Sequence, residues 1–165
     1  SQSAIQVIEI RQAVIDIAYD WFDLPRRENL HIINDDAFHY LQNLEPHSTD
    51  IIFSDLYDAE GMSACQAQKE FISASFRALS EEGCLVINFH DKPQADSELM
   101  DTIKILFTEI IIYDAQQIPF ARNSIMFCCK SSVALHQPDV NWRAELLSRQ
   151  VKMPLMQIYR ELLFT

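Results

Sequence analysis

The sequence predicts an α/β fold built on a largely parallel sheet. Short runs of β-branched and aromatic residues alternate with segments whose apolar residues recur at helical spacing, which is typical of repeated βα units. The chain has 165 residues, 48% of them hydrophobic and 22% charged, and a chain of this size can bury a sizeable core. We therefore expect one α/β domain over residues 1–137 and a helical extension of that domain over residues 138–165.

Six segments have the composition of strands. In chain order they are Ile5–Ile10, Leu30–Ile33, Ile51–Phe53, Cys84–Phe89, Ile110–Tyr113 and Ser124–Cys129. Gly83 marks the entry to the fourth strand. The last two strands have no helical pattern between them, so we expect them to form an antiparallel edge of the sheet.

Helices are predicted where apolar residues repeat every three or four positions. The segments between strands are Ala13–Phe22, which Pro25 ends, Asp35–Leu44, Ala64–Leu79 and Asp96–Phe107. Asp35 is placed to cap the second of these helices. Two amphipathic stretches follow Pro138, and Pro154 separates them, since proline interrupts a helix.

Charge and composition exclude several classes of function. Thirteen Lys and Arg stand against 24 Asp and Glu, a net charge of −11, so no nucleic-acid partner is expected, because phosphate contacts need a basic face. An acidic chain suits solubility or a cationic small ligand. The two glycines, Gly61 and Gly83, are too few for a Gly-rich phosphate loop within this chain.

Membrane, disulfide and metal signals are also lacking in the sequence. No apolar stretch approaches the roughly 18 residues that span a bilayer, and residues 1–10 carry no signal-peptide pattern. The four cysteines form no C-x-x-C pair and are expected to be reduced core residues of a cytoplasmic protein. The five histidines show no paired-ligand spacing, so we expect no metal.

Acidic residues follow four of the predicted strands, and ligands of open parallel sheets bind beyond the carboxyl ends of strands. Glu9 could accept hydrogen bonds from both hydroxyls of a ribose, or it could simply be solvated. Asp36 could bind an adenine amino group, or Asp35 or Asp36 could cap the next helix.

A second acidic group, Asp55 and Asp58, shares one short loop with Tyr57. Two neighbouring carboxylates and an aromatic face favour a cationic amine. The alternatives are an ordinary Asx-turn and a metal site, for which no further ligand stands at suitable spacing.

Four segments stand in an order that carries a family resemblance. They are Val7–Ile10, Asn34–Phe38, Asp50–Gly61 and Ala78–Val86, within residues 5–130. Together they resemble the spermidine synthase (polyamine aminopropyltransferase) family, whose fold is the Rossmann-like class I S-adenosylmethionine-dependent methyltransferase fold. Both glycines occupy positions that the family pattern gives to glycine.

The resemblance implies a transferase that moves an aminopropyl group from decarboxylated S-adenosylmethionine to an amine, or a methyl group from S-adenosylmethionine, without a metal. It implies that Glu9 holds the ribose and that Asp36 and Ala37 bind the adenine.

The resemblance also implies that Asp55 is the catalytic aspartate of a D-x-x-D loop. Asp58 matches its second acid and, with Tyr57, would orient the amine substrate. The family usually has proline at the position of Ala59 and often Asp-Pro at Arg11–Gln12, so the amine itself is left open.

The family's Gly-rich turn lies about 20 residues before the acid matched by Glu9, and only eight residues precede Glu9 here. The chain therefore resembles the downstream part of a larger family member, without the first βα unit of that member. We expect this fragment to be inactive by itself and the missing strand to belong between the strands ending near Glu9 and Ser54.

The alternative is a non-catalytic binding or assembly domain whose C-terminal helices pack on a partner. The chain could also form a homo-oligomer.

Overall fold

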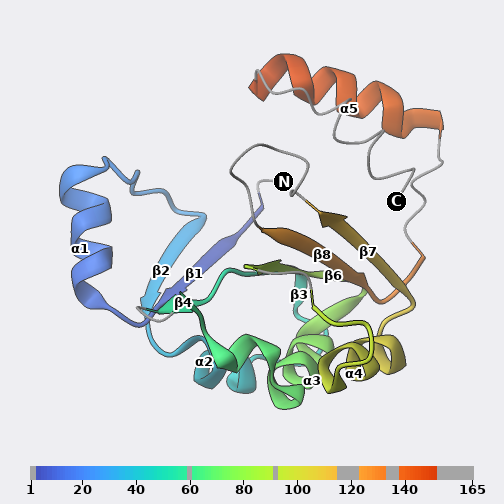
Figure 1. Ribbon diagram of the computed structural model, residues 1–165. Coiled ribbons are helices and arrows are strands. Elements are labelled where there is room, and N and C mark those ends of the chain that lie inside the picture. Colours follow the sequence, from blue (N-terminus) through green and yellow to red (C-terminus); the bar gives the residue numbers. More distant parts are fainter. Residues whose placement is uncertain (1–2, 59–60, 91–92, 115–122, 133–137, 152–165) are drawn as a thin grey trace. The chain divides into compact units, whose positions relative to one another are not determined.

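The computed structural model describes residues 3–58, 61–90, 93–114, 123–132 and 138–151 (Figure 1). They fall into two compact units, one ending at Glu45 and the other beginning at Pro46. Each unit is an α/β arrangement of its own, as the alternation of strand and helix patterns predicts.

The first unit is a βαβα segment. Strand β1 (Ile5–Glu9) pairs in parallel with β2 (Leu30–Asn34), and helix α1 (Gln12–Trp21) connects them. Glu9 lies opposite Asn34 in the register, and the Asn34 side-chain amide donates to the carbonyl oxygens of Glu9 and Ile10, each at 2.9 Å. The carboxyl ends of the two strands are therefore tied together.

Helix α2 (Ala37–Asn43) begins one residue later than the sequence predicts, because its N-cap is Asp36. Oδ1 of Asp36 accepts a hydrogen bond from the backbone N–H of His39 at 2.8 Å. Asp35, the predicted cap, accepts instead from the N–H of Asp36 at 2.8 Å and lies 3.1 Å from the His39 ring.

The second unit contains a four-stranded sheet. In spatial order its strands are β3 (Thr49–Ser54), β6 (Leu79–Phe89), β8 (Ser124–Cys129) and β7 (Glu109–Asp114). β3 is parallel to β6, whereas β8 is antiparallel to both of its neighbours. The predicted antiparallel pairing of the last two strands is confirmed, and β8 lies inside the sheet with β7 at its edge.

Strand β6 begins at Leu79 and not at the predicted Cys84, because the start of the pairing contains a bulge. Thr49 pairs with Leu79 and Ile51 with Cys84, so β6 has extra residues between these two points. Gly83 lies at this irregularity, where a Cβ atom would come within 2.9 Å of the Leu79 Cβ and the Ser80 carbonyl oxygen. Glycine fits there because it has no side chain.

Two helices cover one face of this sheet: α3 (Lys69–Ala78) and α4 (Glu98–Leu106) (Figure 1). The fully buried apolar residues between them and the sheet include Ile72, Leu85, Ile87, Ile103 and Met126. The alternating residues of β6 and β8 that point to the other face are mostly half-buried. The core of the second unit therefore lies on the helical side of its sheet.

The single helix predicted over Ala64–Leu79 is two elements. A 3₁₀-helix, η1 (Ala64–Ala67), is followed by Gln68 in an extended conformation and then by α3. After Pro138 the first amphipathic stretch is helix α5 (Pro138–Val151), and the second lies outside the described residues. In the part of the chain that the structure describes, no helix is long and apolar enough to cross a membrane.

Candidate active site

Asp55 follows the last residue of β3, at the carboxyl end of the strand pair that β3 forms with β6. The Asn88 side chain on β6 donates through Nδ2 to Oδ1 of Asp55 at 2.7 Å. Asn123 in turn donates to Oδ1 of Asn88 at 2.9 Å. Because Asn123 occupies the Asn88 oxygen, the Asn88 amide must present its N–H₂ group to Asp55.

A buried glutamine binds the residues on both sides of Asp55. Gln66 in η1 has no solvent-accessible surface, and its Oε1 accepts from the hydroxyl of Ser54 at 2.7 Å and from the N–H of Leu56 at 3.1 Å. Its Nε2 donates to the carbonyl oxygen of Asn88 at 3.0 Å. One side chain thus connects the acidic loop to β6.

Gln66 could not be singled out from the sequence, since glutamine is common on exposed helix positions. Its one signal in the sequence was its place just after the acidic loop, where a long amide can reach neighbouring backbone. Asn123 gave no signal of its own.

The loop after Asp55 is a small hairpin. β4 (Tyr57–Asp58) pairs antiparallel with β5 (Gly61–Met62), and Ser63 N–H closes the base by donating to the Leu56 carbonyl at 2.8 Å. Gly61 has φ +127°, a conformation that residues with a Cβ rarely adopt. The predicted catalytic and amine-binding residues therefore share one short structure, in which Asp55 and Asp58 are exposed and Tyr57 is half-buried.

The residues predicted to bind the nucleoside lie in the first unit. Glu9 ends β1, and its Oε1 accepts from the backbone N–H of Arg11 at 2.8 Å and from Arg11 Nε at 3.1 Å. Asp36 caps α2 and Ala37 is the first residue of that helix. Asp36 thus caps its helix, as the second interpretation of this residue expected. Both hydrogen bonds to the Glu9 carboxylate fall on Oε1.

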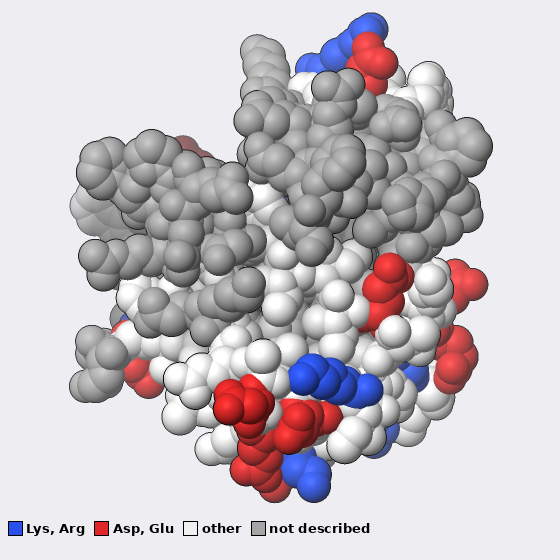
Figure 2. All heavy atoms as spheres, turned by 45° about the vertical axis from the view of Figure 1, so that its right-hand side comes forward, with Lys and Arg blue, Asp and Glu red and all other residues white. Residues whose placement is uncertain are grey.

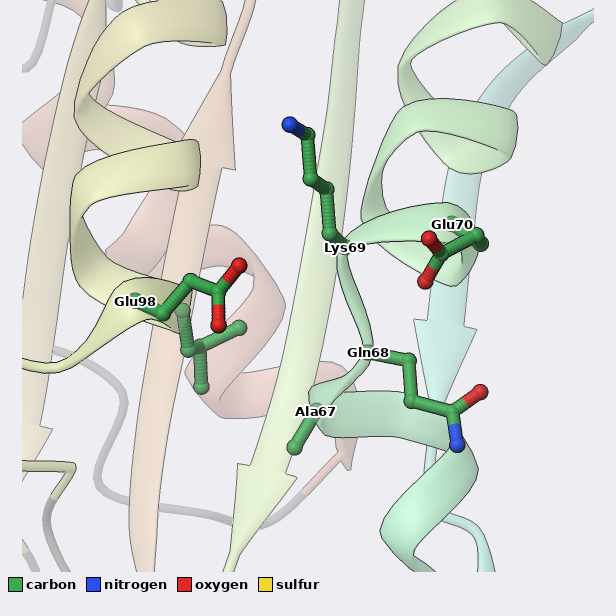
Figure 3. A pocket seen from close by; sticks show the side chains of 6 residues that line it. Ala67, Gln68, Lys69, Glu70 and Glu98 are labelled. Atoms are coloured by element: carbon green, nitrogen blue, oxygen red, sulfur yellow. The ribbon is translucent and has the colours of Figure 1, made fainter.

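Acidic and basic side chains are interspersed on the face shown in Figure 2, where Lys and Arg lie among Asp and Glu. Within the described ranges, no group of three His, Cys, Asp or Glu gathers as a metal site would require. A hollow of about 260 Å³ lies where η1 ends and where α3 and α4 begin (Figure 3). Its lining residues are Ala67, Gln68, Lys69, Glu70, Glu98 and Leu99, and none of them is a predicted site residue.

Comparison with solved structures defines the class of fold. A probable spermidine synthase from Corynebacterium glutamicum is 21% identical with a TM-score of 0.69, over 89% of this chain and 55% of its own. A spermidine synthase in complex with the transition-state analogue AdoDATO is 19% identical with a TM-score of 0.63, over 78% of this chain and 47% of its own. Human methyltransferase-like protein 13 in complex with SAH is 20% identical with a TM-score of 0.70, over 92% of this chain and 72% of its own. The chain thus has the Rossmann-like methyltransferase-type fold that the sequence predicts.

The family follows from the sequence itself. Residues 1–139 match the model of the spermine/spermidine synthase domain, and the chain belongs to that family. A search of curated protein sequences found no significant match. The chain spans about half the length of the spermidine synthases named above.

Replacement of Gln66 tests its role in the acidic loop. Gln66→Leu removes the partner of three polar groups, so we expect the free energy of unfolding to fall by about 2–4 kcal/mol. Gln68→Leu, two residues away at an exposed position, should change it by less than about 0.5 kcal/mol. Urea denaturation of both variants measures the difference, and equal losses would show that Gln66 does not fix the loop.

Proposed function

We propose that a protein containing this chain transfers an aminopropyl group from decarboxylated S-adenosylmethionine to an amine. The amine nitrogen forms a bond to the propyl carbon next to the sulfonium, the carbon–sulfur bond breaks, and methylthioadenosine leaves with the bonding electron pair. The nitrogen loses one proton. This displacement needs alignment and a neutral attacking amine, but no nucleophile from the protein.

Asp55 supplies the proton acceptor in this proposal. An alkyl amine with a pKa near about 10.4 must lose a proton before it attacks, which costs roughly 4.6 kcal/mol at pH 7. The observation that carries the proposal is the hydrogen bond from Asn88, which fixes one Asp55 oxygen at the carboxyl end of β3. A carboxylate held in this way can bind the ammonium group and receive or relay its proton.

The hairpin residues support a cationic substrate. Asp58 adds a second carboxylate beside Asp55 on the same loop, and Tyr57 adds an aromatic ring. Negative potential and a ring face both attract an ammonium group. We therefore infer that the second amino group or the alkyl chain of the amine lies along Tyr57 and Asp58.

The nucleoside part of the co-substrate is assigned to Glu9, Asp36 and Ala37. Glu9 Oε1 already binds Arg11, so the ribose hydroxyls would bind Oε2 or share Oε1. Asp36 would bind the adenine amino group while it continues to cap α2, because a carboxylate has several acceptor positions.

Methyl transfer from S-adenosylmethionine is the second candidate, favoured by the similarity to a methyltransferase-like protein that binds SAH. Both reactions displace a thioether from a carbon next to a sulfonium. They differ in the nucleoside product, which is methylthioadenosine after aminopropyl transfer and S-adenosylhomocysteine after methyl transfer. Mass spectrometry of reactions with each co-substrate separates them.

Glu9→Gln tests the assignment of the ribose site. Loss of a charge-assisted hydrogen bond should weaken binding of an S-adenosyl sulfonium nucleoside by about 1.5–3 kcal/mol, roughly 10- to 150-fold. The amide oxygen of glutamine can still accept from the Arg11 backbone, so the fold should persist. Calorimetry on a nucleoside-binding protein that contains this chain measures the change, with Glu28→Gln at an exposed position of the same unit as the control. Equal affinities for wild type and Glu9→Gln would reject Glu9 as the ribose ligand.

A further inference from the structure

Two cysteines face each other across neighbouring strands of the four-stranded sheet. Cys84 on β6 and Cys129 on β8 are directly opposite in the antiparallel register, so their side chains leave the same face of the sheet. The Cys129 thiol donates to the Cys84 sulfur, with 2.7 Å between the sulfur atoms. Both cysteines are free thiols in the structure.

The register makes this pair suitable for a covalent bond. The next opposite pair is Gly83 and Lys130, and the Lys130 N–H donates to the Gly83 carbonyl at 3.0 Å. Pairs whose backbones are hydrogen-bonded to each other alternate along an antiparallel ladder with pairs whose backbones are not. The backbones of Cys84 and Cys129 are therefore not bonded to each other. The Cα atoms of such a pair lie about 4.5 Å apart, within the roughly 4.4–6.8 Å range of disulfides.

The two thiols have different environments. The hydrogen bond from Cys129 lowers the pKa of Cys84 and raises the pKa of Cys129. Cys84 is half-buried, whereas Cys129 is 3% exposed. Cys84 is therefore the thiol that a small oxidant can reach and that more readily forms the reactive thiolate.

The adjacent cysteine is a natural internal comparison. Cys128 is fully buried and, as a neighbour of Cys129 on a strand, points to the opposite, helix-covered face. Burial raises the pKa of Cys128 to about 12, so little thiolate forms there near neutral pH.

We propose that Cys84 and Cys129 are a site of reversible oxidation by a small peroxide, which joins β6 and β8 through a disulfide bond. The Cys84 thiolate attacks one oxygen of hydrogen peroxide, the O–O bond breaks, and Cys84 becomes a sulfenic acid while hydroxide leaves. The sulfur of Cys129 then attacks the Cys84 sulfur, and the sulfenic oxygen leaves as water with the Cys129 proton. In total two thiols and one hydrogen peroxide give one disulfide and two waters.

The test begins with the wild-type chain, reduced with dithiothreitol and then treated with hydrogen peroxide. The remaining thiols are alkylated in denaturant, and the digested chain is mapped by mass spectrometry. We expect a peptide containing Cys84 joined to the peptide containing Cys128 and Cys129, and one alkylated thiol left in the latter. The oxidised chain should melt about 5–10 °C higher than the reduced chain, because the bond closes a long loop, and dithiothreitol should reverse this shift.

Variants assign the partner, because Cys128 and Cys129 fall in one peptide. Cys128→Ser should keep both the cross-link and the rise in melting temperature, whereas Cys129→Ser and Cys84→Ser should lose both. Persistence of the cross-link in Cys129→Ser would overturn the proposal. The proposal would also be overturned if Cys84 and Cys129 of the wild-type chain could still be alkylated after a peroxide treatment that oxidises Cys65. If a variant fails to fold, fragmentation of the linked wild-type peptide decides the question, because it shows whether the alkylated residue is Cys128, as we expect, or Cys129.

Discussion

Asp55→Asn is expected to lower turnover about a hundredfold or more in an active protein that contains this chain. The asparagine can still bind Asn88 through its side-chain oxygen, but it carries no charge and accepts no proton from the amine. Affinity for the sulfonium nucleoside should stay within a few fold, because the nucleoside is assigned to Glu9 and Asp36. Steady-state rates and calorimetry on the same preparations measure the two effects.

Asp50→Asn is the matched control, since Asp50 lies near the start of the same strand, where it accepts from the Ser80 hydroxyl at 3.1 Å. We expect turnover within about twofold of wild type, because an exposed substitution far from the reacting groups costs little. If Asp55→Asn also keeps near wild-type turnover, Asp55 is only a turn residue and the non-catalytic binding role becomes the better account.

The second large effect concerns the glycine-rich βα unit that the family pattern places ahead of Glu9. We expect the 165-residue chain alone to bind an S-adenosyl sulfonium ligand weakly or not at all. A longer protein that adds this unit should bind the ligand stoichiometrically and unfold at a higher temperature. Calorimetry and thermal unfolding of the two proteins measure the gain.

The exposed strand edges supply the physical reason. Among the residues described, β1 pairs only with β2, and β3 pairs only with β6. Ile51 and Phe53 of β3 are 53% and 75% exposed, and Ile5 of β1 is 49% exposed. Apolar strands with an unpaired edge are usually covered or paired, and an added strand at either edge would pair the outer backbone groups of that edge.

The control for this experiment replaces the glycines of the added loop with valine. Side chains there would block close approach of the backbone to the nucleoside, so the added strand should still raise the melting temperature while binding is lost. Tight, stoichiometric binding of an S-adenosyl ligand by the 165-residue chain alone would contradict this account.

The strands of this fold could be predicted from the sequence because their apolar, β-branched runs stand between clear loop signals. Ser124–Cys129 matches β8 in full. The prediction of one continuous helix over Ala64–Leu79 was wrong, because the chain is extended at Gln68. The apolar spacing continues through this residue and gives no sign of the break. That break depends on hydrogen bonds from Gln66 to the acidic loop and to β6, which no local pattern contains.

The same limit applies to the candidate site. Asp55 could be singled out because it follows a short apolar strand. Its partner Asn88 lies 33 residues further along the chain, and Asn123 lies 35 residues beyond Asn88. Only the pairing of β3, β6 and β8 brings these three side chains together, so their hydrogen bonds follow from the sheet order and not from spacing in the sequence.

Analysis of the reaction products tests whether the protein transfers an aminopropyl group. An active protein that contains this chain is incubated with decarboxylated S-adenosylmethionine and a panel of primary diamines, and the products are identified by mass spectrometry. The proposal predicts methylthioadenosine and an amine extended by one aminopropyl group in equal amounts, with both lost in Asp55→Asn. A parallel incubation replaces the co-substrate with S-adenosylmethionine. The proposal would be contradicted if the protein formed a methylated product in that reaction and left decarboxylated S-adenosylmethionine unused.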